Sequence, residues 1–147
     1  MKNFIFFLCL LLSFNIFSQI QTPAPSPATN VQQTIGLTDI TLEYARPSVR
    51  NRVVFGNLVP FNKIWRTGAN EATEITLTGK VLFGKDTLKA GTYSIFSIPN
   101  ENEWTIILNG NLGQWGAYNY VEKADVLRMT VPTQKIKEVV YEPFTIT

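Results

Sequence analysis

The chain has 147 residues, with 13 lysines and arginines against 11 aspartates and glutamates, one cysteine and no histidine. A formal net charge of +2 is too small for a nucleic-acid binder that works by neutralising phosphates, so no nucleic-acid partner is expected. The lack of histidine excludes a Ser-His-Asp triad and histidine-based zinc, iron or copper sites.

Residues 1–18 predict a secretory signal peptide. Lys2 supplies a positive start, and residues 4–17 are an almost unbroken apolar run that is too short to span a bilayer comfortably. Ser18 is a small residue at the expected cleavage site. Cys9 lies inside the apolar run, so we expect no lipidation, and cleavage removes it, which excludes disulfides and thiolate catalysis. We therefore expect a periplasmic or extracellular protein with no membrane span after cleavage.

Residues 19–30 predict a linker, because three prolines lie among small polar residues in this stretch. Such a composition is typical of an extended spacer, although a tail without a role explains it equally well. The remaining residues, 31–147, are enough for one domain that buries roughly two thirds of its extended-chain surface.

Alternating apolar and polar residues then predict strands. The first two, over residues 31–36 and 38–45, flank a turn at Gly36. Arg46-Pro47 ends the second strand, because proline cannot donate to a ladder and restricts the residue before it. Residues 48–62 form an irregular, apolar loop that is expected to cap one end of the core.

Further strands are predicted over residues 73–78, 80–83, 87–88, 92–98, 103–108, 126–131 and 137–146. Gly84-Lys85-Asp86 and Asn109-Gly110 are tight-turn signals between them. No long helical period is visible, and turn signals recur roughly every eight to twelve residues. This pattern predicts an all-β fold with a single antiparallel β-sandwich, jelly-roll-like or a partly open barrel.

The central stretch, Trp65-Arg66-Thr67-Gly68-Ala69-Asn70-Glu71-Ala72-Thr73, carries the most distinctive chemistry. If residues 67–70 form a turn with Gly68 at positive φ, Arg66 and Glu71 meet across its base. They then form a polar clamp for a ligand, with Trp65 as a stacking wall. The alternative is an ion pair that holds the loop against the core, with Trp65 buried as packing.

A small basic group precedes this stretch, at Arg46, Arg50 and Arg52. Guanidinium groups bind carboxylate or phosphate bidentately, so three of them together suit an anionic ligand. The alternative is a solvated loop in which one arginine, Arg46, turns inward to satisfy backbone carbonyls.

A glycine-rich aromatic loop over residues 113–120 is the best candidate for a binding surface. Trp115 and Tyr118 lie among small residues, which lets a sugar or peptide approach their rings closely. An equally good interpretation is that Trp115 plugs the open end of the sandwich and Tyr118 covers it.

The acids Glu43, Glu71 and Glu74 raise the question of glycoside hydrolysis. Hydrolysis requires two carboxyl groups about 5 to 9 Å apart, and the sequence spacing does not show that geometry. No loop of the calcium-binding D-x-D type occurs either.

Several of these runs resemble one family: Arg46-Pro47-Ser48, Leu58-Val59-Pro60, the central stretch, and residues 90–94 and 114–118. Together they are similar to the bacterial Domain of Unknown Function 2911 family over nearly all of residues 26–147. The resemblance implies an exported, β-rich domain from Gram-negative bacteria and brings no catalytic residues.

Two features depart from that family pattern. Asn51 and Asn62 stand where relatives are expected to have glycine, and asparagine tolerates the left-handed region best, which predicts positive φ at both. Relatives are also expected to continue past Thr147, so the sandwich is expected to lack its last strands and to expose a sheet edge.

We therefore expect an exported, non-catalytic module that needs neither cofactor nor metal and binds a glycan, a peptide or an envelope component. Its predicted binding surface comprises Arg46, Trp65, Arg66, Asn70, Glu71, Trp115 and Tyr118. Two alternatives remain open: a metal-independent carboxylate hydrolase with Glu71 as acid or base, and a purely structural envelope domain. Glu71 and Trp115 at opposite poles of the molecule would rule out the binding surface.

Overall fold

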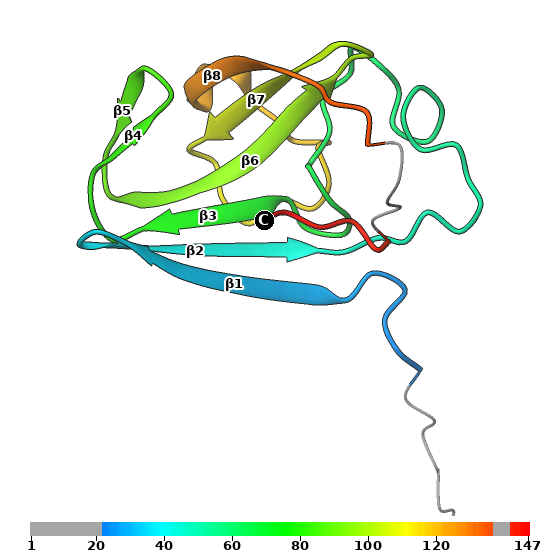
Figure 1. Ribbon diagram of the computed structural model, residues 1–147, viewed down its shortest axis with the longest axis horizontal. Coiled ribbons are helices and arrows are strands. Elements are labelled where there is room, and N and C mark those ends of the chain that lie inside the picture. The colour runs from blue at the N-terminus through cyan, green and yellow to red at the C-terminus, as the bar shows by residue number, and fades with distance from the viewer. Residues whose placement is uncertain (1–21, 137–141) are drawn as a thin grey trace, which may run out of the picture.

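The computed structural model describes residues 22–136 and 142–147. The predicted signal peptide and the start of the linker lie outside the described residues. Eight strands are present: β1 (Ala28–Ile35), β2 (Thr38–Ala45), β3 (Thr73–Leu77), β4 (Val81–Phe83), β5 (Asp86–Leu88), β6 (Gly91–Pro99), β7 (Glu103–Asn109) and β8 (Asp125–Pro132). One short 3-10 helix, η1 (Glu122–Ala124), precedes β8 (Figure 1). Among the described residues no α-helix occurs, which confirms the all-β prediction.

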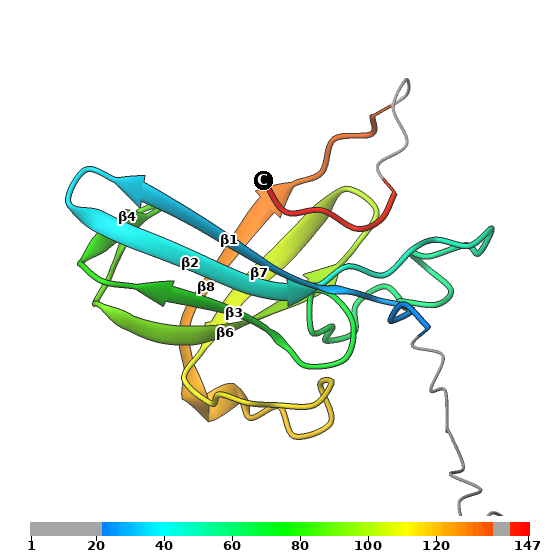
Figure 2. The ribbon, with the colours of Figure 1, turned by 90° about the horizontal axis from the view of Figure 1, so that it is seen from below.

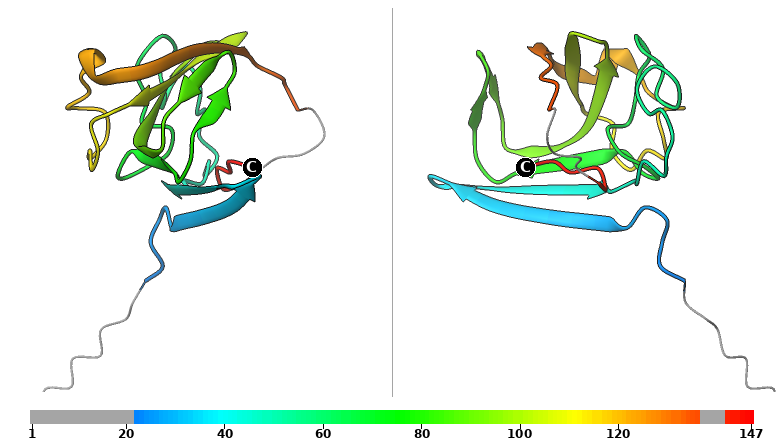
Figure 3. Two further views of the ribbon diagram at one scale, coloured as in Figure 1. Left: turned by 90° about the vertical axis from the view of Figure 1, so that its left-hand side faces the viewer. Right: turned by 45° about the vertical axis from the view of Figure 1, so that its right-hand side comes forward.

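Six strands form one antiparallel sheet in the order β1-β2-β3-β6-β7-β8, and β4 pairs with β5 in a separate hairpin. The sheet is not closed into a barrel, because β1 and β8 do not pair with each other. It is strongly curled, so that β6, β7 and β8 rise away from the level of β1 and β2 (Figures 1 and 3). The prediction of an antiparallel, open β architecture is therefore confirmed.

The sheet is covered on both faces where β6 crosses its middle. Successive strand residues point to opposite faces, and here Ile95 packs with the core cluster of Leu77, Leu88 and Leu108. Its neighbour Phe96, which is fully buried, packs with the second cluster on the other face. The β4–β5 hairpin supplies Leu88 and so covers the first face, whereas irregular loops cover the second.

The loop between β2 and β3 projects from one end of the sheet (Figure 2). Near its end Trp65 pairs with Ser97 of β6, with N···O distances of 2.7 and 2.8 Å. β3 occupies the same side of β6 as far as Ile95. Trp65 and β3 therefore both pair with β6, and the residues between them, 66–72, form a loop that does not pair with β6. We call residues 66–72 the central loop. The Thr73 N–H donates to the Arg66 carbonyl at 3.2 Å and closes the loop's base.

Two further predictions concern the backbone. Asn51 and Asn62 have φ values of 57° and 59°, so the predicted positive φ is confirmed at both. The predicted last strand, over residues 137–146, lies partly outside the described residues, and residues 142–147 form no strand. Instead the Phe144 N–H donates to the Pro47 carbonyl at 2.9 Å.

In the described part of the chain, no helix has the length and apolar character to cross a membrane.

Candidate functional site

The central loop is held in shape by its own polar groups. Trp65 Nε1 donates to the Gly68 carbonyl at 3.1 Å, and Thr73 Oγ1 donates to the Thr67 carbonyl at 2.7 Å. Thr67 and Asn70 adopt positive φ, at 55° and 59°. A Cβ at Gly68, whose φ is 159°, would lie 3.1 Å from the Ala45 carbonyl oxygen. The loop therefore packs against the end of β2 and needs glycine there.

The central loop pairs with the aromatic loop, which was predicted over residues 113–120 and in the structure extends over residues 110–121, between β7 and η1. The Ala72 N–H donates to the Gln114 carbonyl at 2.8 Å, and the Gly116 N–H donates to the Asn70 carbonyl at 3.0 Å. Glu71 and Trp115 face each other across this bridge. The structure thus places these two predicted site residues side by side rather than at opposite poles.

A groove of about 620 Å³ lies on one side of the central loop, and we call it the acidic groove. Its polar and aromatic lining residues include Asn30, Glu43, Asn70, Glu71, Glu74 and Trp115. Among the described residues, no lysine or arginine lines it. Its volume is typical of a small-molecule site, and its carboxylates favour a neutral or cationic ligand over an anionic one.

Two strands bring these carboxylates together. Glu43 on β2 is directly opposite Glu74 on β3. Glu43 accepts a 2.8 Å hydrogen bond from Asn30, and Glu74 accepts one of 2.7 Å from the Gly113 N–H. Glu74 therefore anchors the aromatic loop next to the groove. The sequence alternation correctly identified these strands but not the groove that the two carboxylates share.

A second hollow, of about 1050 Å³, lies on the other side of the central loop. We call it the apolar hollow, because most of its wall is apolar, including Val53, Phe55, Leu58, Trp65 and Phe144. Arg52, Arg66 and Tyr118 also line it. Ala69 and Asn70 line both hollows, so the central loop is the ridge between them.

The predicted ion pair between Arg66 and Glu71 is not formed. The ion pairs among the described residues are both made by Arg128. Glu71 lines the acidic groove and Arg66 lines the apolar hollow. The positive-φ residues between them and the pairing of Glu71 with Trp115 explain why the two side chains face opposite sides of the ridge.

Trp65 and Arg46 take structural positions. Trp65 is only 9% exposed and packs edge-on against Phe55, Trp104 and Phe144, with ring centroids 5.4 to 6.0 Å apart. Trp65 is therefore buried as packing, as the alternative interpretation predicted, and its ring is not free to stack on a ligand. Arg46 turns inward, with Nε donating to the Phe144 carbonyl at 3.1 Å and Nη2 to Thr145 Oγ1 at 2.7 Å. It lines neither hollow.

The two aromatic residues of the predicted surface are exposed but separated. Trp115 is 61% exposed and lines the acidic groove, whereas Tyr118 is 84% exposed and lines the apolar hollow. Neither plugs the end of the core. That position belongs to Tyr120, whose ring packs on Phe96 with centroids 5.1 Å apart.

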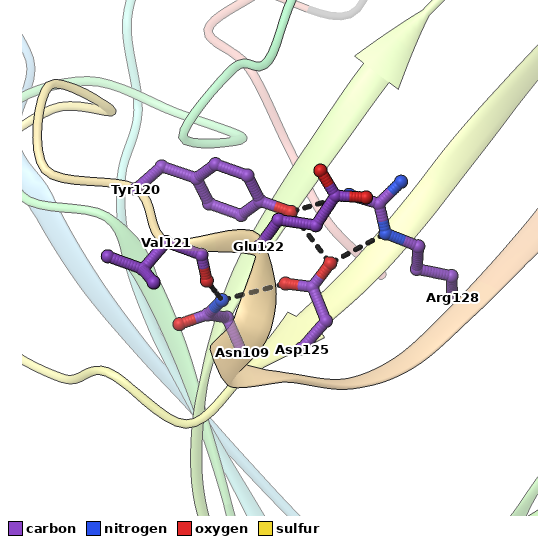
Figure 4. Close-up of polar contacts among 6 residues, drawn as sticks. All are labelled: Asn109, Tyr120, Val121, Glu122, Asp125 and Arg128. Carbon is purple, nitrogen blue, oxygen red and sulfur yellow. Dashed lines mark hydrogen bonds and ion pairs between the residues drawn. The ribbon is translucent and has the colours of Figure 1, made fainter.

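A polar network that the sequence analysis missed fixes both ends of the aromatic loop (Figure 4). Asp125 accepts hydrogen bonds from Asn109 at 2.7 Å, from Tyr120 at 2.7 Å and from Arg128 at 2.6 Å. Asn109 also donates to the Val121 carbonyl at 2.9 Å. The Asn109-Gly110 turn was the sole sequence signal at this position, because the partners are up to 19 residues apart, from Asn109 to Arg128.

The network raises the pKa values of two of its members, Tyr120 and Arg128. Burial, and then the hydrogen bond to Asp125, raises the pKa of Tyr120 to about 12. The hydrogen bond to Asp125 also raises the pKa of Arg128 above its usual value. The phenol therefore stays protonated and the guanidinium charged at neutral pH, and both serve as donors to one carboxylate. Among the described residues no cluster of three or more acidic, histidine or cysteine side chains is arranged to hold a metal.

Comparison with known proteins gives one finding. A family model described as "Protein of unknown function (DUF2911)" matches residues 26–147. Searches of curated proteins and of solved structures give no match.

Proposed function

Because the chain belongs to the DUF2911 family, whose function is unknown, we propose a function from its geometry: an exported, non-catalytic module that binds a glycan in the acidic groove. One observation carries the proposal. Trp115, Glu71 and Asn70 lie together in one groove of small-molecule size, and the aromatic ring is exposed. Of the other predicted site residues, Trp65, Arg66 and Tyr118 line the apolar hollow, and Arg46 donates hydrogen bonds to Phe144 and Thr145.

The groove offers what a sugar ring needs. An exposed indole can cover the apolar face of a sugar, and carboxylate and amide side chains accept and donate hydrogen bonds to its hydroxyl groups. Glu43, Glu71 and Glu74 provide acceptors, and Asn70 provides a donor. Because the described residues of the wall include three carboxylates and no lysine or arginine, a neutral or amino sugar fits better than an acidic one.

The test is a screen of neutral, amino and acidic oligosaccharides, followed by calorimetric titration of those that bind. We expect Trp115→Ala to weaken binding at least tenfold, which is about 1.4 kcal/mol. Because the Trp115 side chain is largely exposed, we expect the substitution to change the free energy of unfolding by less than about 0.5 kcal/mol. Tyr118→Ala is the matched control, since this exposed aromatic residue lines the other hollow. No binding by any oligosaccharide, or equal binding by Trp115→Ala and wild type, would rule the proposal out.

Export is the part of the proposal that rests on the N-terminal sequence, Lys2 and the apolar run of residues 4–17. Expressed in full in a Gram-negative host, the protein is expected in the periplasmic or extracellular fraction with an N-terminus at Gln19. Mass spectrometry of the purified protein measures this directly. A cytoplasmic chain that retains Lys2 would contradict export.

A hydrolase is the second candidate, because the acidic groove holds more than one carboxylate. Glu43 and Glu74 face each other across β2 and β3, and Glu71 lines the same groove. If the protein cleaves a bound glycan, incubation releases new reducing ends and Glu71→Gln stops the release. Recovery of the glycan intact after long incubation excludes the hydrolase and leaves the binding module.

A further inference from the structure

Arg66 is the one arginine among the described residues whose guanidinium has no acceptor. Arg46, Arg50, Arg52 and Arg128 each donate to a carbonyl, hydroxyl or carboxylate oxygen. Arg66 makes no side-chain hydrogen bond or ion pair with the part of the chain that the structure describes, and its Nε is fully buried. A buried donor without an acceptor is costly, and the rest of the Arg66 side chain is half-buried and lines the apolar hollow. An anion in the hollow would supply the missing acceptor.

The surroundings of Arg66 show what kind of anion fits. Among the described residues, no aspartate or glutamate lines the apolar hollow, so no carboxylate of that part of the chain competes with an anionic ligand. Most of the wall is hydrocarbon, and much of it is exposed, with Val53 at 68% and Leu58 and Phe55 partly exposed as well. A small inorganic anion would leave this apolar surface in water, whereas an apolar ligand without charge would leave Arg66 unpaired.

The apolar hollow lies along the β2–β3 loop, which supplies most of its lining residues and projects beyond the end of the sheet (Figures 1 and 2). Phe144 lines the hollow as well, and its carbonyl accepts a hydrogen bond from Arg46. Arg66 and Arg52 both line it, so the hollow combines an apolar surface with two positive charges.

We propose that the apolar hollow binds a single-chain aliphatic carboxylate, a fatty acid. The carboxylate pairs with the guanidinium of Arg66, for which planar oxyanions are the best-matched partners. The hydrocarbon chain lies against Val53, Phe55 and Leu58, where burial of its CH₂ groups favours binding. This site is separate from the acidic groove, and it stands or falls independently of the glycan proposal.

The experiment compares three amphiphiles that share a ten-carbon chain, by calorimetric titration of the purified protein at concentrations at which they form no micelles. Decanoate is expected to bind with one-to-one stoichiometry. Decanol, which lacks the charge, and decyltrimethylammonium, which reverses it, are expected to bind at least tenfold more weakly. Equal binding of decanoate and decyltrimethylammonium would show only a non-specific apolar surface and would overturn the proposal, as would the absence of decanoate binding.

Two variants assign the contacts. Arg66→Met, which keeps the volume and removes the charge, is expected to weaken decanoate binding at least tenfold and to leave decanol binding unchanged. Val53→Asp, at an exposed position in the wall, is expected to weaken decanoate binding by a similar factor without altering the core. Leu37→Asp is the matched control, because Leu37 is fully exposed in the β1–β2 turn. Unchanged decanoate affinity in both Arg66→Met and Val53→Asp would overturn the proposal.

Discussion

Arg128 at the base of the aromatic loop and Arg66 in the wall of the apolar hollow differ in whether the guanidinium has an acceptor. Arg128 donates to Asp125 and to the Tyr120 hydroxyl, and Glu122 lies 3.3 Å from it. Arg66 has no acceptor among the described residues. The comparison indicates that Arg128 contributes to folding, whereas the acceptor for Arg66 is the one that our proposed ligand would supply.

Of the substitutions that test this difference between the two arginines, we expect the largest loss of stability at Asp125, whose side chain is largely buried. Asp125→Ala leaves Asn109, Tyr120 and Arg128 without their shared acceptor. We expect a loss of about 3 kcal/mol in the free energy of unfolding, measured by urea titration. Glu122→Ala, which removes the exposed partner of Arg128, is the control and is expected to cost less than about 0.5 kcal/mol. Equal costs for the two variants would show that Asp125 is not the centre of the network.

The second effect contrasts two arginines changed in the same way. Arg46→Met removes the donors to Phe144 and Thr145, and we expect it to cost about 1–2 kcal/mol in the free energy of unfolding. Arg66→Met removes a charge that has no acceptor, so we expect no loss or a small gain in stability. Urea unfolding of both variants without ligand measures the difference. A loss at Arg66 as large as that at Arg46 would assign Arg66 a structural role.

The smallest effect is a pH dependence at Tyr120. Its pKa in the folded protein, about 12, is higher than the ordinary value of 10.0. A raised pKa means that the stabilisation by the protonated phenol is complete below pH 10 and is lost as the pH rises through 12. Wild type is therefore expected to lose stability more steeply than Tyr120→Phe between pH 10 and 12 in thermal unfolding. Parallel curves for the two proteins would contradict the raised pKa.

The sequence predicted the strands because their alternation is local. Ile40 and Leu42 point to one face of β2, and they pair with Leu77 and Ile75 of β3 as a period of two requires. The positive φ of Asn51 and Asn62 was also predictable, since a single residue type indicates it. These features depend on neighbours along the chain, so one sequence suffices to find them.

The candidate site was predictable only in part, because side chains from separate segments build it. The sequence identified Glu71 and Trp115, which the backbone pairing of two loops brings together. It could not show that Arg66 and Glu71 face opposite hollows, since that depends on the path of residues 67–70. Asp125 was missed because its donors come from Asn109, Tyr120 and Arg128, which no short motif connects.

The ridge formed by Ala69 and Asn70 has a consequence for how the protein responds to two ligands at once. One short stretch of main chain borders both cavities, and Asn70 is also tied to the Ser26 carbonyl by a 3.3 Å hydrogen bond. If a ligand bound in one hollow displaces this ridge, the affinity of the other hollow for its own ligand changes. Thermodynamic reciprocity then requires the same factor in both directions. If both proposed ligands bind, this ridge gives the domain a route to heterotropic coupling.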